Sequence, residues 1–188
     1  LIKGAIVGMQ LIVAIAASIM PEHYNLGRWH ATGTIGVFGA ASAAGAILGL
    51  TPEEMCKAFG VCAVLCSGIQ LNFGTMAKPM AAGMAAKNGL MAAILAGRGF
   101  TGRADIFDTD FLDNICTRKA DIEKLLERLY GPYGIHVLRF KRYPCGAPTH
   151  SGIIYCKKIL AEHPHAIVAI EKIVFEPYPR AIRLVRNM

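Results

Sequence analysis

The first residue that could do chemistry is His30, which ends a polar loop and directly precedes the sequence Ala-Thr-Gly-Thr of residues 31–34. Backbone N–H groups at such a helix entry, together with the hydroxyls of Thr32 and Thr34, can bind an anion. A histidine beside that position can donate a hydrogen bond to a bound carboxylate or transfer a proton. The alternative is an ordinary loop histidine with a single hydrogen bond, because a lone histidine is a weak signal.

The second candidate is Lys78, the only cation in the sequence between residues 58 and 86. Thr75 lies three residues before it, and Pro79 follows it at the start of another apolar segment. A partly buried lysine can bind a substrate carboxylate or act as a base. The alternative is a lysine at a helix start whose long side chain extends to solvent.

The third candidate is an irregular segment, residues 141–150, that follows the helical part of the chain. It joins cations, an aromatic ring and a histidine, namely Lys141, Arg142, Tyr143 and His150. Clefts between domains are where small-molecule sites usually form, although the same residues could form a plain basic hinge. Cys145 could act as a nucleophile with His150, but no Asn or Asp partner is visible in a known arrangement, which argues against it.

Composition limits the classes of protein to which these residues can belong. The 188 residues are 54% hydrophobic and 18% charged, which excludes a disordered chain. The net charge is +7, and it is uneven, because residues 1–97 carry eight charged side chains and residues 98–188 carry twenty-five. This basic balance suits an anionic partner. No cluster of Lys and Arg is interleaved with aromatic residues, so small carboxylated or phosphorylated molecules fit better than nucleic acid.

Helices dominate the expected elements of the first 135 residues. We expect helices over residues 1–19, 34–48, 52–71, 79–97 and 119–130, and a loop over residues 21–29. Thr51 and Glu54 form the pattern of a capping box at the start of the third helix. The Gly and Ala content of residues 31–97 predicts close helix packing. It also predicts five buried side chains, those of Ala41, Ala44, Val61, Leu65 and Ala92.

The end of the chain has a different residue pattern from the helical part. Residues 149–163 are typical of a helix, and residues 165–175 are typical of a strand. The sequence therefore predicts a mainly α protein. Its Ala/Gly-rich helical bundle occupies residues 1–135, and a smaller α+β lid domain begins over residues 136–188. The chain opens with Leu1 rather than Met and its last residues form no pattern typical of a chain end, so we expect it to be part of a longer polypeptide. The sequence has no signal-peptide pattern.

Two further patterns bear on the cellular setting. Three uncharged runs approach the roughly 20 residues that a bilayer span needs. They are rich in Gly, Ala and Thr and have no aromatic belt, so we expect core helices rather than membrane spans.

The six cysteines form no CxxC pair and no zinc-finger spacing. We therefore expect reduced thiols, a cytoplasmic protein and no bound metal.

Taken in order along the chain, these segments resemble the MmgE/PrpD family, which contains 2-methylcitrate dehydratases, cis-aconitate decarboxylase and iminodisuccinate epimerase. The resemblance rests on residues 29–34, 74–79 with 83–89, 95–102, and 141–145 with 149–150. It covers nearly the whole chain. Two positions depart from the family pattern, because Ala31 replaces a common proline and Ala81 stands where many members have a histidine.

The resemblance implies a cofactor-independent enzyme, usually a homodimer, with a helical domain that carries most of the active site. It matches His30, Lys78 and Lys141 to the family's active-site residues. We expect His30 to transfer a proton while both lysines bind carboxylates. Around them we expect a set of substrate-binding residues, Thr32, Thr34, Thr75, Arg142, Tyr143 and His150.

The expected activity is that of a hydro-lyase on a small di- or tricarboxylic acid, similar to 2-methylcitrate dehydratase of propionate metabolism. Cations are needed because a carbanion beside a carboxylate gathers negative charge in the transition state. Decarboxylation and epimerisation within the same family stay open. A non-catalytic relative that only binds carboxylates is the alternative from another class.

Overall fold

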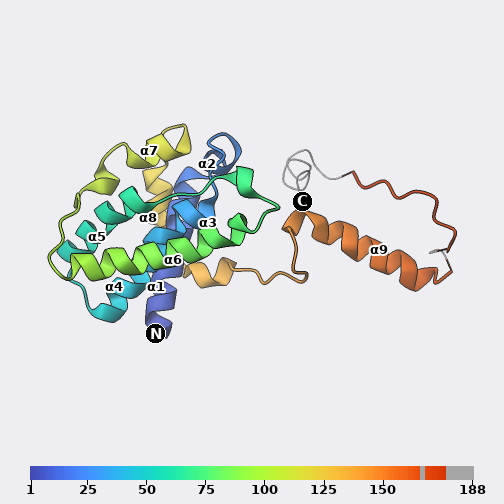
Figure 1. Cartoon of the computed structure of the whole chain (residues 1–188), viewed down its shortest axis with the longest axis horizontal. Coiled ribbons are helices and arrows are strands. Elements are labelled where there is room, and N and C mark those ends of the chain that lie inside the picture. The colour runs from blue at the N-terminus through green and yellow to red at the C-terminus, as the bar shows by residue number, and fades with distance from the viewer. Residues whose placement is uncertain (166–167, 177–188) are drawn as a thin grey trace. The chain divides into compact units, whose positions relative to one another are not determined.

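The computed structural model describes residues 1–165 and 168–176 (Figure 1). Contacts divide the chain into two compact units. The first comprises Leu1–Asn72 and Met76–Leu138, and the second comprises Phe73–Thr75 and Arg139–Met188.

The first unit is a bundle of helices arranged around α4 (Gly36–Leu48). Helix α4 packs against α1 (Ile2–Ile19) and against α6 (Ala77–Ala96), and Figure 1 shows α6 lying along α4. Helix α5 (Pro52–Leu65) packs on both α4 and α6. Helix α8 (Ile122–Tyr130) packs on α1. The mainly α class predicted from the sequence is confirmed.

Short helices complete the first unit. They are α2 (Glu22–Asn25), α3 (Ala31–Thr34), η1 (Gln70–Asn72), η2 (Ile106–Asp108), α7 (Phe111–Cys116) and η3 (Gly134–Val137). The expected loop over residues 21–29 thus contains one helical turn, α2. In the second unit, η4 (Ala147–Thr149) leads directly into α9 (His150–Glu162).

The core of the bundle combines small residues with a cluster of phenylalanines. Phe38 is buried, and its ring centroid lies 5.3 Å from that of Phe107 and 5.7 Å from that of Phe111. Four of the five side chains predicted to be buried are so: Ala41, Ala44, Val61 and Ala92. Leu65 is only partly buried, because it is the last residue of α5 and packs at the edge of the core.

The start of α5 follows the sequence prediction, whereas its end does not. Thr51 and Glu54 form both hydrogen bonds of the capping box. The helix ends at Leu65 rather than near residue 71, because Cys66 is extended and Gly68 has a φ of 124°. That φ is disfavoured for residues with a Cβ, so the chain leaves the helix there.

The strand predicted over residues 165–175 is absent where the structure describes that segment. Residues 168–176 are irregular, and Val168, Ile173 and Val174 are exposed. A strand needs a neighbouring strand to bond its backbone groups. No such neighbour exists among residues 1–165 and 168–176. Residues 166 and 167 lie outside the described residues.

Two stretches of the described chain, Ile2–Ile19 and Ala31–Leu48, are apolar and long enough to cross a membrane. Core helices of soluble proteins have the same length and composition, so this test alone is weak. In the second stretch 56% of the residues are buried inside the protein. This burial is what a central helix of a bundle requires.

The close approach of α4 and α6 depends on Gly89. A Cβ at this position would overlap the carbonyl oxygen of Val37 and lie 2.5 Å from the Cβ of Ala40. Gly83 lies on the same helix and faces open space. A methyl group added at Gly89 would therefore collide with α4, whereas one added at Gly83 would meet nothing.

We predict that Gly89→Ala destabilises the full-length protein by about 1–3 kcal/mol, the usual cost of overpacking a tight core. Gly83→Ala is the control, and we expect it to be neutral or to stabilise by up to about 1 kcal/mol, because Ala favours a helix. Denaturant unfolding measures both. Equal effects of the two variants would contradict the packing of α6 on α4.

Candidate active site

His30 is held at the start of α3 by its backbone. Its N–H donates to the carbonyl oxygen of Gly68 at 3.0 Å, and Trp29 forms an antiparallel bridge with Ile69. The N–H of Gln70 donates to the carbonyl oxygen of Arg28 at 3.0 Å. Residues 28–30 and 68–70 thus lie side by side, and the early end of α5 is what makes this pairing possible.

Gly33 is needed where this pair of segments meets α3. A Cβ on Gly33 would overlap the carbonyl oxygen of Ser67. The N–H groups of Gly33 and Thr34 both donate to the carbonyl oxygen of His30, at 2.9 and 3.2 Å. The backbone donors that were expected to bind an anion are therefore partly used to close the short turn of α3.

The two threonines of this turn lie in different surroundings. Thr32 is exposed, whereas Thr34 is only 1% exposed. The Thr34 hydroxyl lies 2.8 Å from Nε2 of His23, a side chain with no exposed surface. Direct contact of either threonine with substrate stays a prediction, and the Thr34 hydroxyl already has a partner inside the protein.

The residue His30 is buried, with 7% of its surface exposed. Burial lowers its pKa below the ordinary value, because a charged ring would lose its hydration. The positive charge of Lys78 lowers the pKa of His30 further. His30 is therefore neutral at neutral pH, the form in which an imidazole can accept a proton. The structure brings these two predicted residues into electrostatic contact although they are far apart in sequence.

Lys78 is the second residue of α6, a helix of 20 residues. The amino end of a helix carries partial positive charge, and Lys78 adds a full charge in that first turn. An anion is the species that this arrangement favours. Lys78 is partly buried, and Thr75, three residues earlier, is exposed.

The remaining predicted residues form a cluster within the second unit. The ring of Tyr143 lies edge-on to the ring of His150, with 5.3 Å between centroids. The guanidinium carbon of Arg142 lies 6.0 Å from the Tyr143 centroid, and Nζ of Lys157 lies 5.9 Å from it. One aromatic ring therefore has two cations and a histidine around it.

Lys141 belongs to the same segment and is exposed. Its Nζ donates to the carbonyl oxygen of Cys145 at 3.0 Å. The thiol of Cys145 lies 3.1 Å from the Thr149 hydroxyl. A nucleophilic role for Cys145 with His150 gains no support from these contacts. The convergence of Lys141 with His30 and Lys78 stays a prediction from the sequence.

Two residues of these clusters, Lys157 and His23, are not among the candidates predicted from the sequence. Lys157 stands seven residues after His150, two helical turns along α9, so helical spacing places both on one face. That signal could have been found. His23 gave no such signal, because a histidine in a polar loop has the same pattern whether it is buried or exposed.

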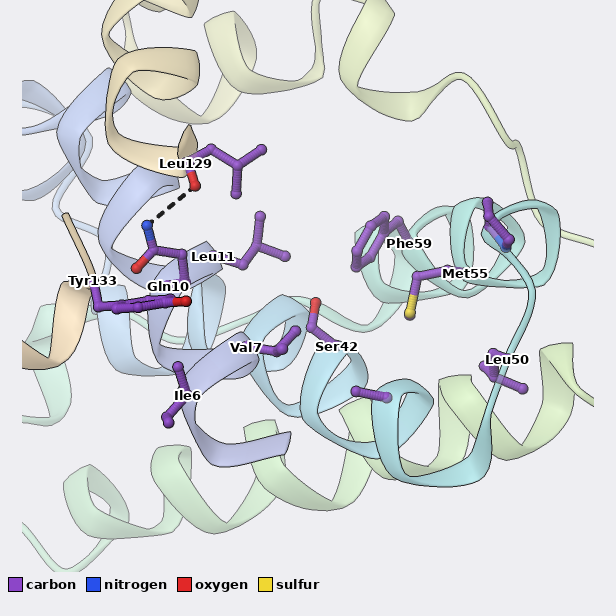
Figure 2. A pocket seen from close by; sticks show the side chains of 12 residues that line it. Ile6, Val7, Gln10, Leu11, Ser42, Leu50, Met55, Phe59, Leu129 and Tyr133 are labelled. Carbon is purple, nitrogen blue, oxygen red and sulfur yellow. Dashed lines mark hydrogen bonds between the residues drawn. The ribbon is translucent and has the colours of Figure 1, made fainter. Parts of the chain in front are cut away.

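An apolar pocket of about 470 Å³ lies elsewhere in the first unit (Figure 2). Side chains of Ile6 and Gln10 on α1, Met55 and Phe59 on α5, and Tyr133 line it. No Lys, Arg or His side chain is among its lining residues. It therefore lacks the cations that a di- or tricarboxylic acid requires, and none of the predicted site residues lines it.

In the part of the chain that the structure describes, no three His, Cys, Asp or Glu side chains are grouped as a metal site.

Comparison with known proteins identifies the family. The model of the MmgE/PrpD N-terminal domain matches residues 1–121, so the chain belongs to the MmgE/PrpD family, as its motifs predict. A cis-aconitate decarboxylase of Aspergillus terreus is 31% identical over 175 residues, which cover 88% of this chain and 36% of that protein. The cis-aconitate decarboxylase of Homo sapiens is 28% identical over 152 residues, 76% of this chain and 29% of the human protein. The chain spans about a third of the length of these curated relatives, which are lyases.

We predict that Lys78→Met raises the pKa of His30, because the change removes a positive charge that lowers it. NMR titration of the histidine rings in the full-length protein measures this pKa, and His30→Gln assigns the signal. Lys87→Met removes a charge from an exposed position on the same helix and is the control. A pKa of His30 that stays constant or falls in Lys78→Met would contradict the contact.

Proposed function

We propose that the protein is a cofactor-independent lyase that acts on a small di- or tricarboxylic acid by proton transfer at the carbon beside a carboxylate. The observation that carries this proposal is the buried His30, whose pKa is lowered first by burial and then by the charge of Lys78. Membership of the MmgE/PrpD family and the lyase names of the matched relatives support it. We further propose a homodimer, as the family resemblance implies, and a cytoplasmic location, as the cysteine pattern suggests.

Dehydration is the reaction for which the state of His30 is best suited. The neutral imidazole takes a proton from the carbon beside a carboxylate, and the electron pair of that C–H bond forms a C=C bond. The hydroxyl on the adjacent carbon takes a proton from solvent and leaves as water, and His30 then releases its proton to solvent. Negative charge gathers on the carboxylate during this step, and a cation at that position stabilises the transition state.

Decarboxylation is the second candidate, and the names of the relatives favour it. In cis-aconitate the C–C bond to the carboxylate on the CH₂ group breaks and CO₂ leaves. The electron pair forms a new C=C bond, and the former alkene CH carbon takes up a proton. His30 would then act as an acid, so it must first be protonated.

The two reactions require opposite forms of His30, so the pH profile separates them. If His30 is a base, turnover falls as the pH drops through the lowered pKa of His30, because the protonated ring cannot accept a proton. If His30 is the acid, turnover falls as the pH rises through the same pKa. With a hydroxy acid as substrate, we expect turnover to fall as the pH drops, because His30 then acts as the base.

The lysine at the start of α6 supplies the second part of the site. We assign Lys78 to binding of a substrate carboxylate, because its charge and the amino end of a 20-residue helix favour the same anion. The cluster of Arg142, Tyr143 and His150 with Lys141 is proposed to bind further carboxylates. Ala81 removes a histidine contact that many relatives of this family have, so we expect a different pattern of substrate contacts.

NMR of the full-length protein in deuterated buffer tests the proposal, with 2-methylcitrate, citrate and cis-aconitate as substrates. We expect an unsaturated product from one of these acids, or deuterium at the carbon beside a carboxylate, and the loss of both in His30→Gln. A protein that binds the acids without conversion or deuterium uptake is the non-catalytic relative, and this result would refute the proposal.

Lys78→Met is expected to lower kcat/KM by roughly 30-fold to 1000-fold, the effect of losing a charged hydrogen bond worth about 2–4 kcal/mol. Methionine keeps most of the aliphatic stem, so the melting temperature should change little. Lys87→Met is the matched control and should retain activity. A Lys78→Met protein that melts several degrees early with full turnover would show a structural lysine instead.

A further inference from the structure

His23 is a buried polar side chain with both ring nitrogens in hydrogen bonds. It lies on α2 and has no exposed surface. Its Nδ1 lies 2.7 Å from the carbonyl oxygen of Ile115 on α7, and its Nε2 lies 2.8 Å from the hydroxyl of Thr34 on α3. One imidazole thus connects the neighbouring short helices α2 and α3 to α7, which lies about 80 residues later in the sequence.

The chemistry of the partners determines the tautomer of this ring. A carbonyl oxygen only accepts, so Nδ1 carries the hydrogen and donates to Ile115. Burial lowers the pKa of His23, which keeps the ring neutral and leaves Nε2 as an acceptor. The hydroxyl of Thr34 must therefore donate to His23. The hydroxyl also lies near the carbonyl oxygen of His30, but that oxygen is farther away, at 3.4 Å.

We propose that His23 is a positioning residue for His30, and that it acts through Thr34. This inference rests on the proposed function to the extent that His30 performs the proton transfer. The N–H of Thr34 donates to the carbonyl oxygen of His30, so the position of Thr34 determines the position of the His30 backbone. His23 in turn joins Thr34 to α7.

The turn that carries His30 needs such a connection because it is only four residues long. A single helical turn is unstable alone, because fixing its backbone costs more free energy than its one hydrogen bond contributes. On one side the turn is held by the bond from His30 to Gly68. On the other side it is held by Thr34, His23 and the carbonyl of Ile115.

A second observation points to the same role for His23. Its ring stacks on the ring of Trp29, with 6.5 Å between centroids and 13° between planes. Trp29 is the residue before His30 and forms the bridge with Ile69. The imidazole of His23 therefore contacts both ends of the segment that presents His30.

Two substitutions at His23 separate positioning from simple stability. In His23→Asn the amide nitrogen takes the place of Nδ1, so the bond to Ile115 can persist while the bond to Thr34 is lost. In His23→Gln the longer side chain can accept from Thr34, while the bond to Ile115 is lost. Helix α2 keeps a second connection near the end of α7 in both variants, because Glu22 forms a salt bridge with Arg118 at 2.9 Å.

Each variant loses one hydrogen bond of the ring, so we expect similar falls in melting temperature. We expect His23→Asn to lower kcat by on the order of 100-fold with little change in KM, the effect of misplacing a reacting group. His23→Gln should retain most of kcat. Equal losses of kcat in the two variants, in step with their stability, would overturn the positioning role.

The wild-type protein provides a test that needs no variant to fold. Nitrogen-15 NMR should show His23 with its hydrogen on Nδ1, and a hydrogen on Nε2 instead would overturn the inference.

Absence of turnover in the wild type would refute the proposed function alone. The His30 ring signals would still report positioning, because they should shift more in His23→Asn than in His23→Gln.

Discussion

The contact of Gly33 with the carbonyl oxygen of Ser67 is the constraint on which the candidate site depends. It allows the chain after α5 to lie directly against the turn that carries His30. Helix α5 must therefore end at Leu65, and Gly68 must adopt a backbone conformation that other residues disfavour. Beyond η1 the chain enters α6, whose first turn holds Lys78. One close backbone contact thus holds the segment of His30 against the chain that leads to Lys78.

The small residues of the bundle explain how polar groups come to be buried beside an apolar core. Ala and Gly at the contact of α4 with α6 bring the helices close together, and little space remains for water. His23 and His30 are buried at the short helices beside this core, and the lost hydration lowers the pKa of both rings. The two neutral histidines differ in their surroundings. His23 has both nitrogens bonded within the protein, whereas His30 has the charge of Lys78 nearby.

Local signals in the sequence predicted much of this structure. The capping box of Thr51 and Glu54 and the mainly α class were recognisable from residue types at short spacing. The family was recognisable from the order of several motifs along nearly the whole chain. The end of α5 was not recognisable from the sequence, because the φ of Gly68 depends on the pairing of its segment with His30 rather than on its neighbours in sequence. The strand over residues 165–175 was predicted from apolar and β-branched residues, yet strand formation needs a partner that local composition does not reveal. His23 was overlooked for a similar reason, since only the fold places it between Thr34 and Ile115.

The central claim is that His30 and Lys78 form one site for a small carboxylic acid. NMR titration of the full-length protein with propane-1,2,3-tricarboxylate, a tricarboxylic acid without a hydroxyl group to eliminate, tests it most directly. The account predicts that the ring signals of His30 and the side-chain signals of Lys78 shift together and saturate at the same concentration. It further predicts that Lys87 does not respond. Saturable binding that leaves both His30 and Lys78 unchanged would contradict the account.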